Sequence, residues 1–217
     1  MFLLKQFSIM LTIIVLFIPF GRSYCHEQNS YLDCQDSFEI MIITEVETNS
    51  ILINLYNISE AINNGDKSND ICTRLENIIY ETQQISVARQ AVKYLGQIDN
   101  DETRRILIRI LNSEFDSIII YETINVLGNK GINENNETII SIVCVFERFN
   151  NIRPDNLIAF ATVNALENII MYNNWLNSYY EVNRVLLRIL DGIYIIPVKE
   201  RARLIFNRIN VTVNLTH

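Results

Sequence analysis

The stretch Val87–Leu111, VARQAVKYLGQIDNDETRRILIRIL, decides the fold through the spacing of its apolar residues. In its first half these residues form one stripe with a 3.6-residue period: Val87, Ala91, Val92 and Leu95. Gly96 follows where a glycine can end a helix in the left-handed conformation, and Asp99 or Asn100 can then cap the next helix. The sequence therefore predicts a helix, a tight turn and a second helix.

The second half, residues 103–111, has its own apolar stripe and a basic side. The inward residues are Ile106, Leu107, Ile110 and Leu111. The outward residues are Arg104, Arg105 and Arg109. Both halves are thus predicted to be amphipathic helices that bury one face.

Parts of this pattern recur along the chain. About 32 residues later the stripe and its glycine return as Ile119, Thr123, Ile124, Leu127 and Gly128. A weaker copy contains Ile158, Thr162, Val163 and Leu166, and a fourth begins at Val198 with Ala202, Arg203 and Phe206. The second helix also recurs, since 184–190 reads RVLLRIL and 105–111 reads RILIRIL. Helix pairs at this period predict an all-α fold, an α-solenoid of antiparallel pairs.

These residues resemble the HEAT-repeat family over about Ile85 to Ile209. The best copies lack the proline expected in the first helix, and the third copy has an aromatic insertion, so an armadillo-like array is the alternative. The resemblance implies a concave side lined by second helices. Arg105, Arg109, Arg184 and Arg188 would lie there at i, i+4 spacing, with guanidinium groups suited to carboxylates on a partner. The alternative interpretation is that these arginines form an ordinary solvent-exposed face of their helices.

The N-terminus has the features of a secretory signal peptide. Lys5 precedes an apolar run of 14 residues, 7–20, and Gly21 and Ser23 fit a cleavage after residue 23. Fourteen helical residues rise only about 21 Å, short of a roughly 30 Å hydrocarbon core. We expect an exported chain, periplasmic or secreted. The alternative is a membrane anchor, either an uncleaved leader or a lipid on Cys25.

The predicted organisation is a signal peptide at 1–23, a polar segment at 24–35 and one helical repeat domain at 36–217. Without Lys5 and Arg22 the chain has 16 basic and 25 acidic residues, a net charge of −9, which disfavours nucleic acid as a partner. Cys25 and Cys34 could form a disulfide across a short loop, whereas Cys72 and Cys144 lie on apolar helix faces and are expected to be buried thiols.

The two ends of the chain differ in charge. Residues 26–66 contain eight acidic and no basic side chains, whereas residues 184–208 contain six basic and two acidic ones. Ends of opposite charge could favour head-to-tail self-association, so the chain could form a homo-oligomer. Alternatively, both charged regions are ordinary solvent-exposed faces.

No catalytic constellation is found in the sequence. His26 and His217 stand at the chain ends, no CxxC occurs, and neither GxSxG, HExxH nor a glycine-rich phosphate loop is present, so we expect no catalytic residue, metal site or cofactor. An aromatic group at the third-unit insertion could form a recognition patch or belong to the core: Tyr172, Trp175, Tyr179, Tyr180 and Tyr194. The expected function is binding of a protein or peptide without enzymatic activity; the alternative is a helical-repeat enzyme, or enzyme-modifying factor, acting on a small molecule or prosthetic group.

Overall fold

The computed structural model describes residues 49–131, 136–172 and 178–216. The chain divides into two compact units, Met1–Asn49 and Ser50–His217, and nearly everything described belongs to the second. Within the described residues all regular elements are helical and none is a strand, which confirms the predicted all-α class. The proposed leader, the lipidation site and the Cys25–Cys34 disulfide lie outside the described residues.

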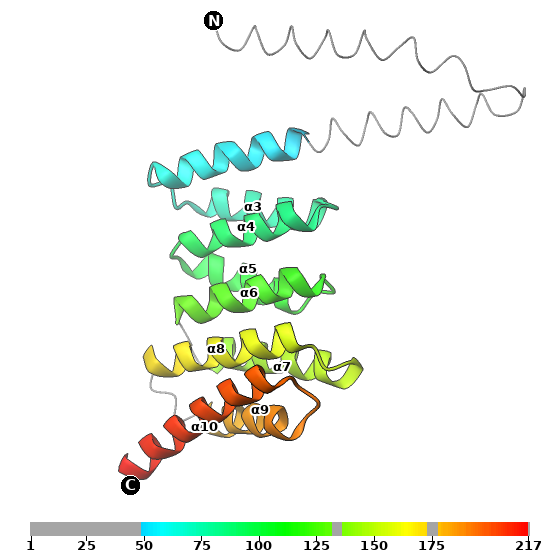
Figure 1. Cartoon of the computed structure of the whole chain (residues 1–217). Coiled ribbons are helices and arrows are strands. Elements are labelled where there is room, and N and C mark those ends of the chain that lie inside the picture. Colours follow the sequence, from blue (N-terminus) through cyan, green and yellow to red (C-terminus); the bar gives the residue numbers. More distant parts are fainter. Residues whose placement is uncertain (1–48, 132–135, 173–177, 217) are drawn as a thin grey trace, which may run out of the picture. The chain divides into compact units, whose positions relative to one another are not determined.

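The second unit is a succession of antiparallel helices joined by short connections (Figure 1). A helix over 49–63 is followed by eight others: α3 (Asn69–Glu81), α4 (Ile85–Gln97), α5 (Asp101–Leu111), α6 (Ser117–Lys130), α7 (Glu137–Ile152), α8 (Asn156–Tyr172), α9 (Tyr179–Asp191) and α10 (Ile196–Thr216). The helices α3, α5, α7 and α9 pack in sequence as one layer, and α4, α6, α8 and α10 pack as the other. This two-layered stack is compatible with an α-solenoid.

The predicted apolar stripes form the core between the layers. In α4, Val87, Ala91, Val92 and Leu95 are buried, and the inward residues of α5 are buried as well. The stripes of the second and third copies are also buried, from Ile119 and Thr123 to Val163 and Leu166. In the fourth copy Val198 and Ala202 are buried, but the prediction was wrong for Arg203, which is exposed, and Phe206 is only half-buried. Period-3.6 patterning thus identified correctly which side of each helix faces its neighbours.

Polar side chains begin several helices as expected. The side chain of Asn100 accepts a hydrogen bond from the Thr103 amide at 2.8 Å, which confirms its predicted role as the cap of α5. Asp116 caps α6 in the same way through the amide of Ile118. Gly131 ends α6 with a φ of 65°, a conformation that suits glycine.

The prediction for Gly96 was wrong. α4 continues through it to Gln97, and its φ is not among the positive values. A Cβ added to Gly96 would lie 3.1 Å from a methyl group of Val126 on α6, and one added to Gly128 would lie 2.5 Å from the Cα of Ala165 on α8. These glycines recur because neighbouring helices approach closely there.

Two further side chains lie opposite to expectation. Arg104, predicted to face outward, is buried, and its Nη1 donates to Glu137 Oε2 on α7 at 2.6 Å. Cys144, predicted to be a buried thiol, is exposed on α7, whereas Cys72 is buried as predicted. At Arg104 the neighbouring helix α7, and not the period of α5 itself, decides the environment.

The sequential pairing also differs from the predicted unit. α4 packs more extensively on α3 than on α5. In the same way, the pairs α5–α6, α7–α8 and α9–α10 pack more extensively than the pairs α6–α7 and α8–α9. The closest sequential pairs are therefore α3–α4, α5–α6, α7–α8 and α9–α10. The stretch 87–111 contains the end of one such pair and the start of the next.

Candidate protein-binding surfaces

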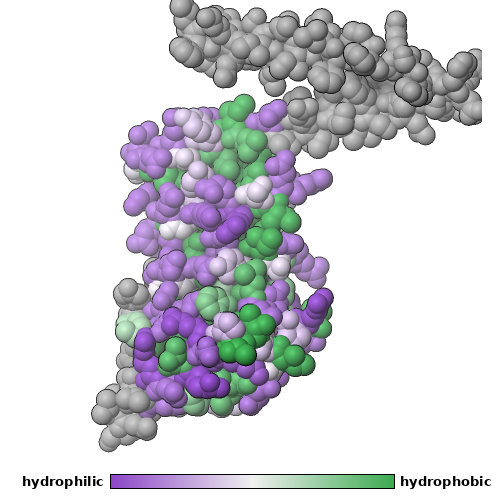
Figure 2. All heavy atoms as spheres, viewed as in Figure 1, coloured by the Kyte–Doolittle hydropathy of each residue, from purple (hydrophilic) through white to green (hydrophobic). Residues whose placement is uncertain are grey.

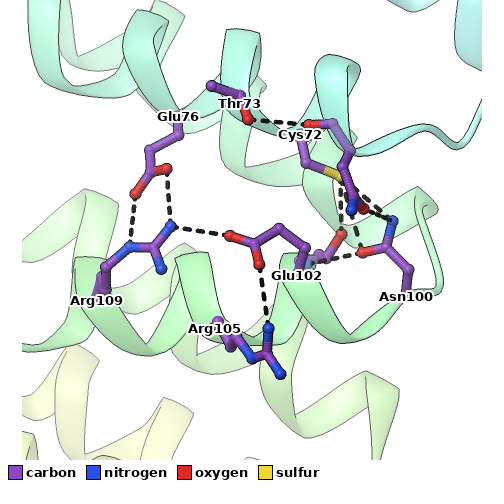
Figure 3. A network of polar contacts seen from close by, with 9 residues as sticks. Cys72, Thr73, Glu76, Asn100, Glu102, Arg105 and Arg109 are labelled. Atoms are coloured by element: carbon purple, nitrogen blue, oxygen red, sulfur yellow. Dashed lines mark hydrogen bonds and ion pairs between the residues drawn. The ribbon is translucent and has the colours of Figure 1, made fainter.

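Arg105 and Arg109 lie on the exposed side of α5, where both contact acidic residues (Figure 3). The guanidinium of Arg109 forms a fork on Glu76 of α3, with Nε and Nη2 each 2.9 Å from a carboxylate oxygen, and Nη2 is 3.2 Å from Glu102. Hydrogen bonding to Glu76 raises the pKa of Arg109. Arg105 Nη1 lies 3.5 Å from Glu102. Arg109 therefore connects two neighbouring helices of one layer.

Arg184 and Arg188 on α9 share one carboxylate. Both contact Glu147 on α7, the preceding helix of the layer, with Arg184 Nε 3.8 Å from its carboxylate and Arg188 closer still. Arg188 thus matches Arg109 in joining its helix to the preceding helix of the layer, whereas Arg184 contacts α7 and Arg105 contacts a residue of its own helix. The side chains remain about half exposed, 48% for Arg109 and 47% for Arg188, but both guanidinium groups already contact a carboxylate of the stack.

The predicted aromatic group is only partly brought together in the described residues. Tyr179 is half-buried and donates to Asn210 Oδ1 at 2.8 Å, and Tyr194 is buried with its ring stacked on Phe146. Burial raises the pKa of Tyr194 to about 12. Tyr180 alone is strongly exposed, whereas Trp175 and the side chain of Tyr172 lie outside the described residues. Tyr179 and Tyr194 therefore belong to packing.

Sequence reasoning missed an apolar surface at the edge of the stack where the connections α3–α4, α5–α6, α7–α8 and α9–α10 lie. We call it the loop edge. Its exposed aliphatic residues are Ile85, Ile118, Ile152, Leu157, Ile193, Ile195 and Ile196. Figure 2 shows hydrophobic residues gathered along this side, on the right of the view.

Contacts between successive connections hold the loop edge together. Tyr80 at the end of α3 hydrogen-bonds Ser113 at 3.0 Å and packs its ring edge-on against Phe115, with centroids 5.0 Å apart. Further along, the Ile195 amide donates to Asn156 Oδ1 at 3.0 Å. These residues are 33 and 39 positions apart, so each contact joins one helix pair to the next.

The α7–α8 connection contains a shallow depression of about 540 Å³. Phe149, Ile152, Pro154 and Leu157 form its apolar lining, and Ile152 is 84% exposed. Arg153 and Asp155 add polar groups at the rim, where Asp155 caps α8 through the amides of Leu157 and Ile158. An aliphatic side chain of a partner would fit such a surface.

A signal for the loop edge was present in the sequence. Four helices of one layer have, as their first or second residue, an aliphatic residue outside the buried stripe: Ile85, Ile118, Leu157 and Ile196. Each stands 33 or 39 positions from the next. Because helices in one layer run in the same direction, their first turns lie along one edge.

The described residues contain no cluster of three or more histidine, cysteine, aspartate or glutamate side chains arranged to hold a metal ion. Of the described helices, none combines the length and hydropathy that crossing a bilayer requires. No protein-family model, curated protein or solved structure matches the chain.

Proposed function

We propose that this chain is an exported, non-enzymatic scaffold that binds another protein, and that the loop edge is the surface it uses. The observation that carries the proposal is the row of exposed aliphatic residues across successive helix pairs, with the depression beside Ile152 and Leu157. Contiguous exposed apolar surface is the usual mark of a protein–protein interaction site.

The loop edge supports this function better than the arginines do. The carboxylates of Glu76 and Glu147 already occupy the guanidinium groups of Arg109 and Arg188. A partner carboxylate would have to compete with these intramolecular pairs. Exposed aliphatic side chains have no such partner, and covering them contributes about 25 cal/mol per Å² of apolar surface removed from water.

Photo-crosslinking from the loop edge tests the proposal. A photoreactive residue at position 152 should give one discrete adduct in the exported fraction of the source cells, and the double variant Ile152→Ser, Leu157→Ser should lose the partner. Ile140 is the matched control, an isoleucine 48% exposed near the other end of α7. No adduct from position 152, or equal loss of the partner from Ile140→Ser, would reject this surface.

Export has a separate test. Mass spectrometry of the natively produced protein should find Tyr24 at the mature N-terminus. A mature chain that begins at Met1, or that carries a lipid on Cys25, would instead indicate a membrane-anchored protein.

A further inference from the structure

We infer that the chain associates head to tail with further copies of itself, the C-terminal end of one stack packing on the N-terminal end of the next. This goes beyond the proposed partner binding, because it uses the two ends of the stack and not the loop edge. The helix 49–63 and α10 lie at opposite ends of the second unit (Figure 1).

The helix 49–63 has a second apolar strip opposite the one it buries. Leu55, Ile58 and Ile62 are buried, and the helical period places Ile53, Tyr56 and Glu60 on the opposite side. Ile53 is 62% exposed and Tyr56 is 63% exposed. The Tyr56 hydroxyl donates to Glu60 at 3.0 Å, so this strip carries a negative charge and two large apolar side chains.

α10 presents a similar strip at the other end, with the opposite charge. Its buried side comprises Val198, Ala202, Ile205 and Ile209. Arg203 and Leu204 lie on the other side, and Leu204 is 62% exposed. Arg201 and Arg208, by contrast, are paired with Glu167 of α8. Arg203 has no ion-pair partner among the described residues.

α9 extends this C-terminal surface. Val182, Val185, Leu186 and Ile189 face the stack, whereas Tyr180 and Leu187 are exposed on the opposite side. Inside the stack each helix pair covers the next one, and among the described residues no further helix pair packs on α9 and α10. In repeat proteins the outer face of a terminal unit needs a polar surface to stay in solution. Here the first and last helices that the structure describes, 49–63 and α10, both expose aliphatic or aromatic residues.

The charges beside the two apolar strips indicate that a second copy of the chain covers them. The C-terminal end offers Arg203, which is unpaired among the described residues, and the half-buried Lys199, and the N-terminal end offers the exposed Glu60. Opposite charges flanking apolar strips favour contact between unlike ends and disfavour contact between like ends. Such a heterologous contact adds copies in a row.

Sedimentation velocity of the full chain over a range of concentrations tests this inference. Mass should rise with concentration, and added salt should weaken association because the charges are exposed. Glu60→Arg and Arg203→Glu should each weaken association at least tenfold. Both changes in one chain should restore it. Arg105→Glu, on the side of the stack, is the control and should leave association unchanged.

Mixing separates a head-to-tail contact from a symmetric dimer. In an equimolar mixture of the Glu60→Arg and Arg203→Glu chains, every head-to-tail contact between unlike variants brings opposite charges together, so the mixture should regain association and grow beyond two copies, whereas a symmetric dimer would stop at two. Circular dichroism melts should show that each variant is folded. A wild-type chain that stays monomeric at all concentrations, or a closed dimer that neither substitution affects, would overturn the inference.

Discussion

Gly128 lies where α6 meets α8, and only a residue without a Cβ fits the approach. An added Cβ would stand 2.5 Å from the Cα of Ala165, a backbone atom that cannot rotate away. At Gly96 the nearest atoms are methyl groups of Val126, at 3.1 Å and 3.2 Å, and a side chain can shift. The two glycines share a place in the sequence pattern but differ in how much the neighbour can yield.

Gly128→Ala should therefore destabilise the protein. Overpacking costs about 1–3 kcal/mol and the better helix propensity of alanine returns up to about 1 kcal/mol, so we expect a net loss of about 1–2 kcal/mol. Urea denaturation measures the change in the free energy of unfolding. Gly96→Ala is the matched control and should change it by less than about 0.5 kcal/mol because the two effects offset each other. Equal stability of both variants would show that α6 and α8 are not so close.

Lys130 is a buried cation at the end of α6. Its Nζ donates to the carbonyl oxygen of Ile98 at 2.5 Å and lies 3.9 Å from Asp99. Burial lowers the pKa of Lys130, with Asp99 opposing the shift. Because the unfolded chain retains the proton to higher pH, the free energy of unfolding should rise with pH between the lowered pKa and 10.5.

The test compares the wild-type chain with Lys130→Met. The difference in free energy of unfolding between the two should grow in favour of the wild type as pH rises through that window. Lys93 of α4 lines the same surface depression as Lys130. Lys93→Met therefore provides the control substitution. A difference that does not change with pH would mean that Lys130 titrates normally.

At the scale of elements, one carboxylate joins α10 to α8. Glu167 is buried, and it accepts from Arg201 and from Arg208. A buried carboxylate without a partner would be costly, and two guanidinium groups satisfy it. This contact fixes how the last helix lies on the stack.

Glu167→Gln should destabilise the chain by about 2–4 kcal/mol, less than a fully buried pair would cost because both arginines are partly exposed. Hydrogen exchange should report earlier opening of α10 than of α4 or α6. Glu102→Gln serves as the control, since its pairs with Arg105 and Arg109 are at the surface and should contribute under about 1 kcal/mol. If the α10 amides of Glu167→Gln keep their protection from exchange, Glu167 does not hold α10 on the stack.

At the scale of the molecule, each helix contacts near neighbours in the chain and has few contacts beyond them. The stability of such a stack is approximately a sum of local terms and nearest-neighbour interfaces. A core shared by all helices would instead make every part depend on every other.

A chain that ends at Asn177, and so lacks α9 and α10, should remain folded. Hydrogen exchange in α3 to α6 should be nearly unchanged, while α7 and α8 lose protection because they lose their covering pair. The full chain is the reference for each helix. Loss of protection throughout the shortened chain would show that the fold is one cooperative unit.

The sequence by itself determined the helices and their buried faces, because a 3.6-residue period of apolar residues has one favourable arrangement, burial of that stripe. It also indicated the cap of α5, at Asp99 or Asn100, since a capping side chain bonds an amide two or three residues away. Local chemistry was sufficient for these features.

Only the tertiary structure decided what depends on the neighbouring helix. Gly96 and Gly128 serve close packing, Arg104 is buried against Glu137, and Arg109 is paired with Glu76, in each case through residues about 30 or more positions away. The loop edge likewise exists only because helices of one layer run in the same direction and bring their first turns together. A helical period states which side of a helix is buried, but the partner that covers it, and the surface left uncovered, follow from the packing of distant segments.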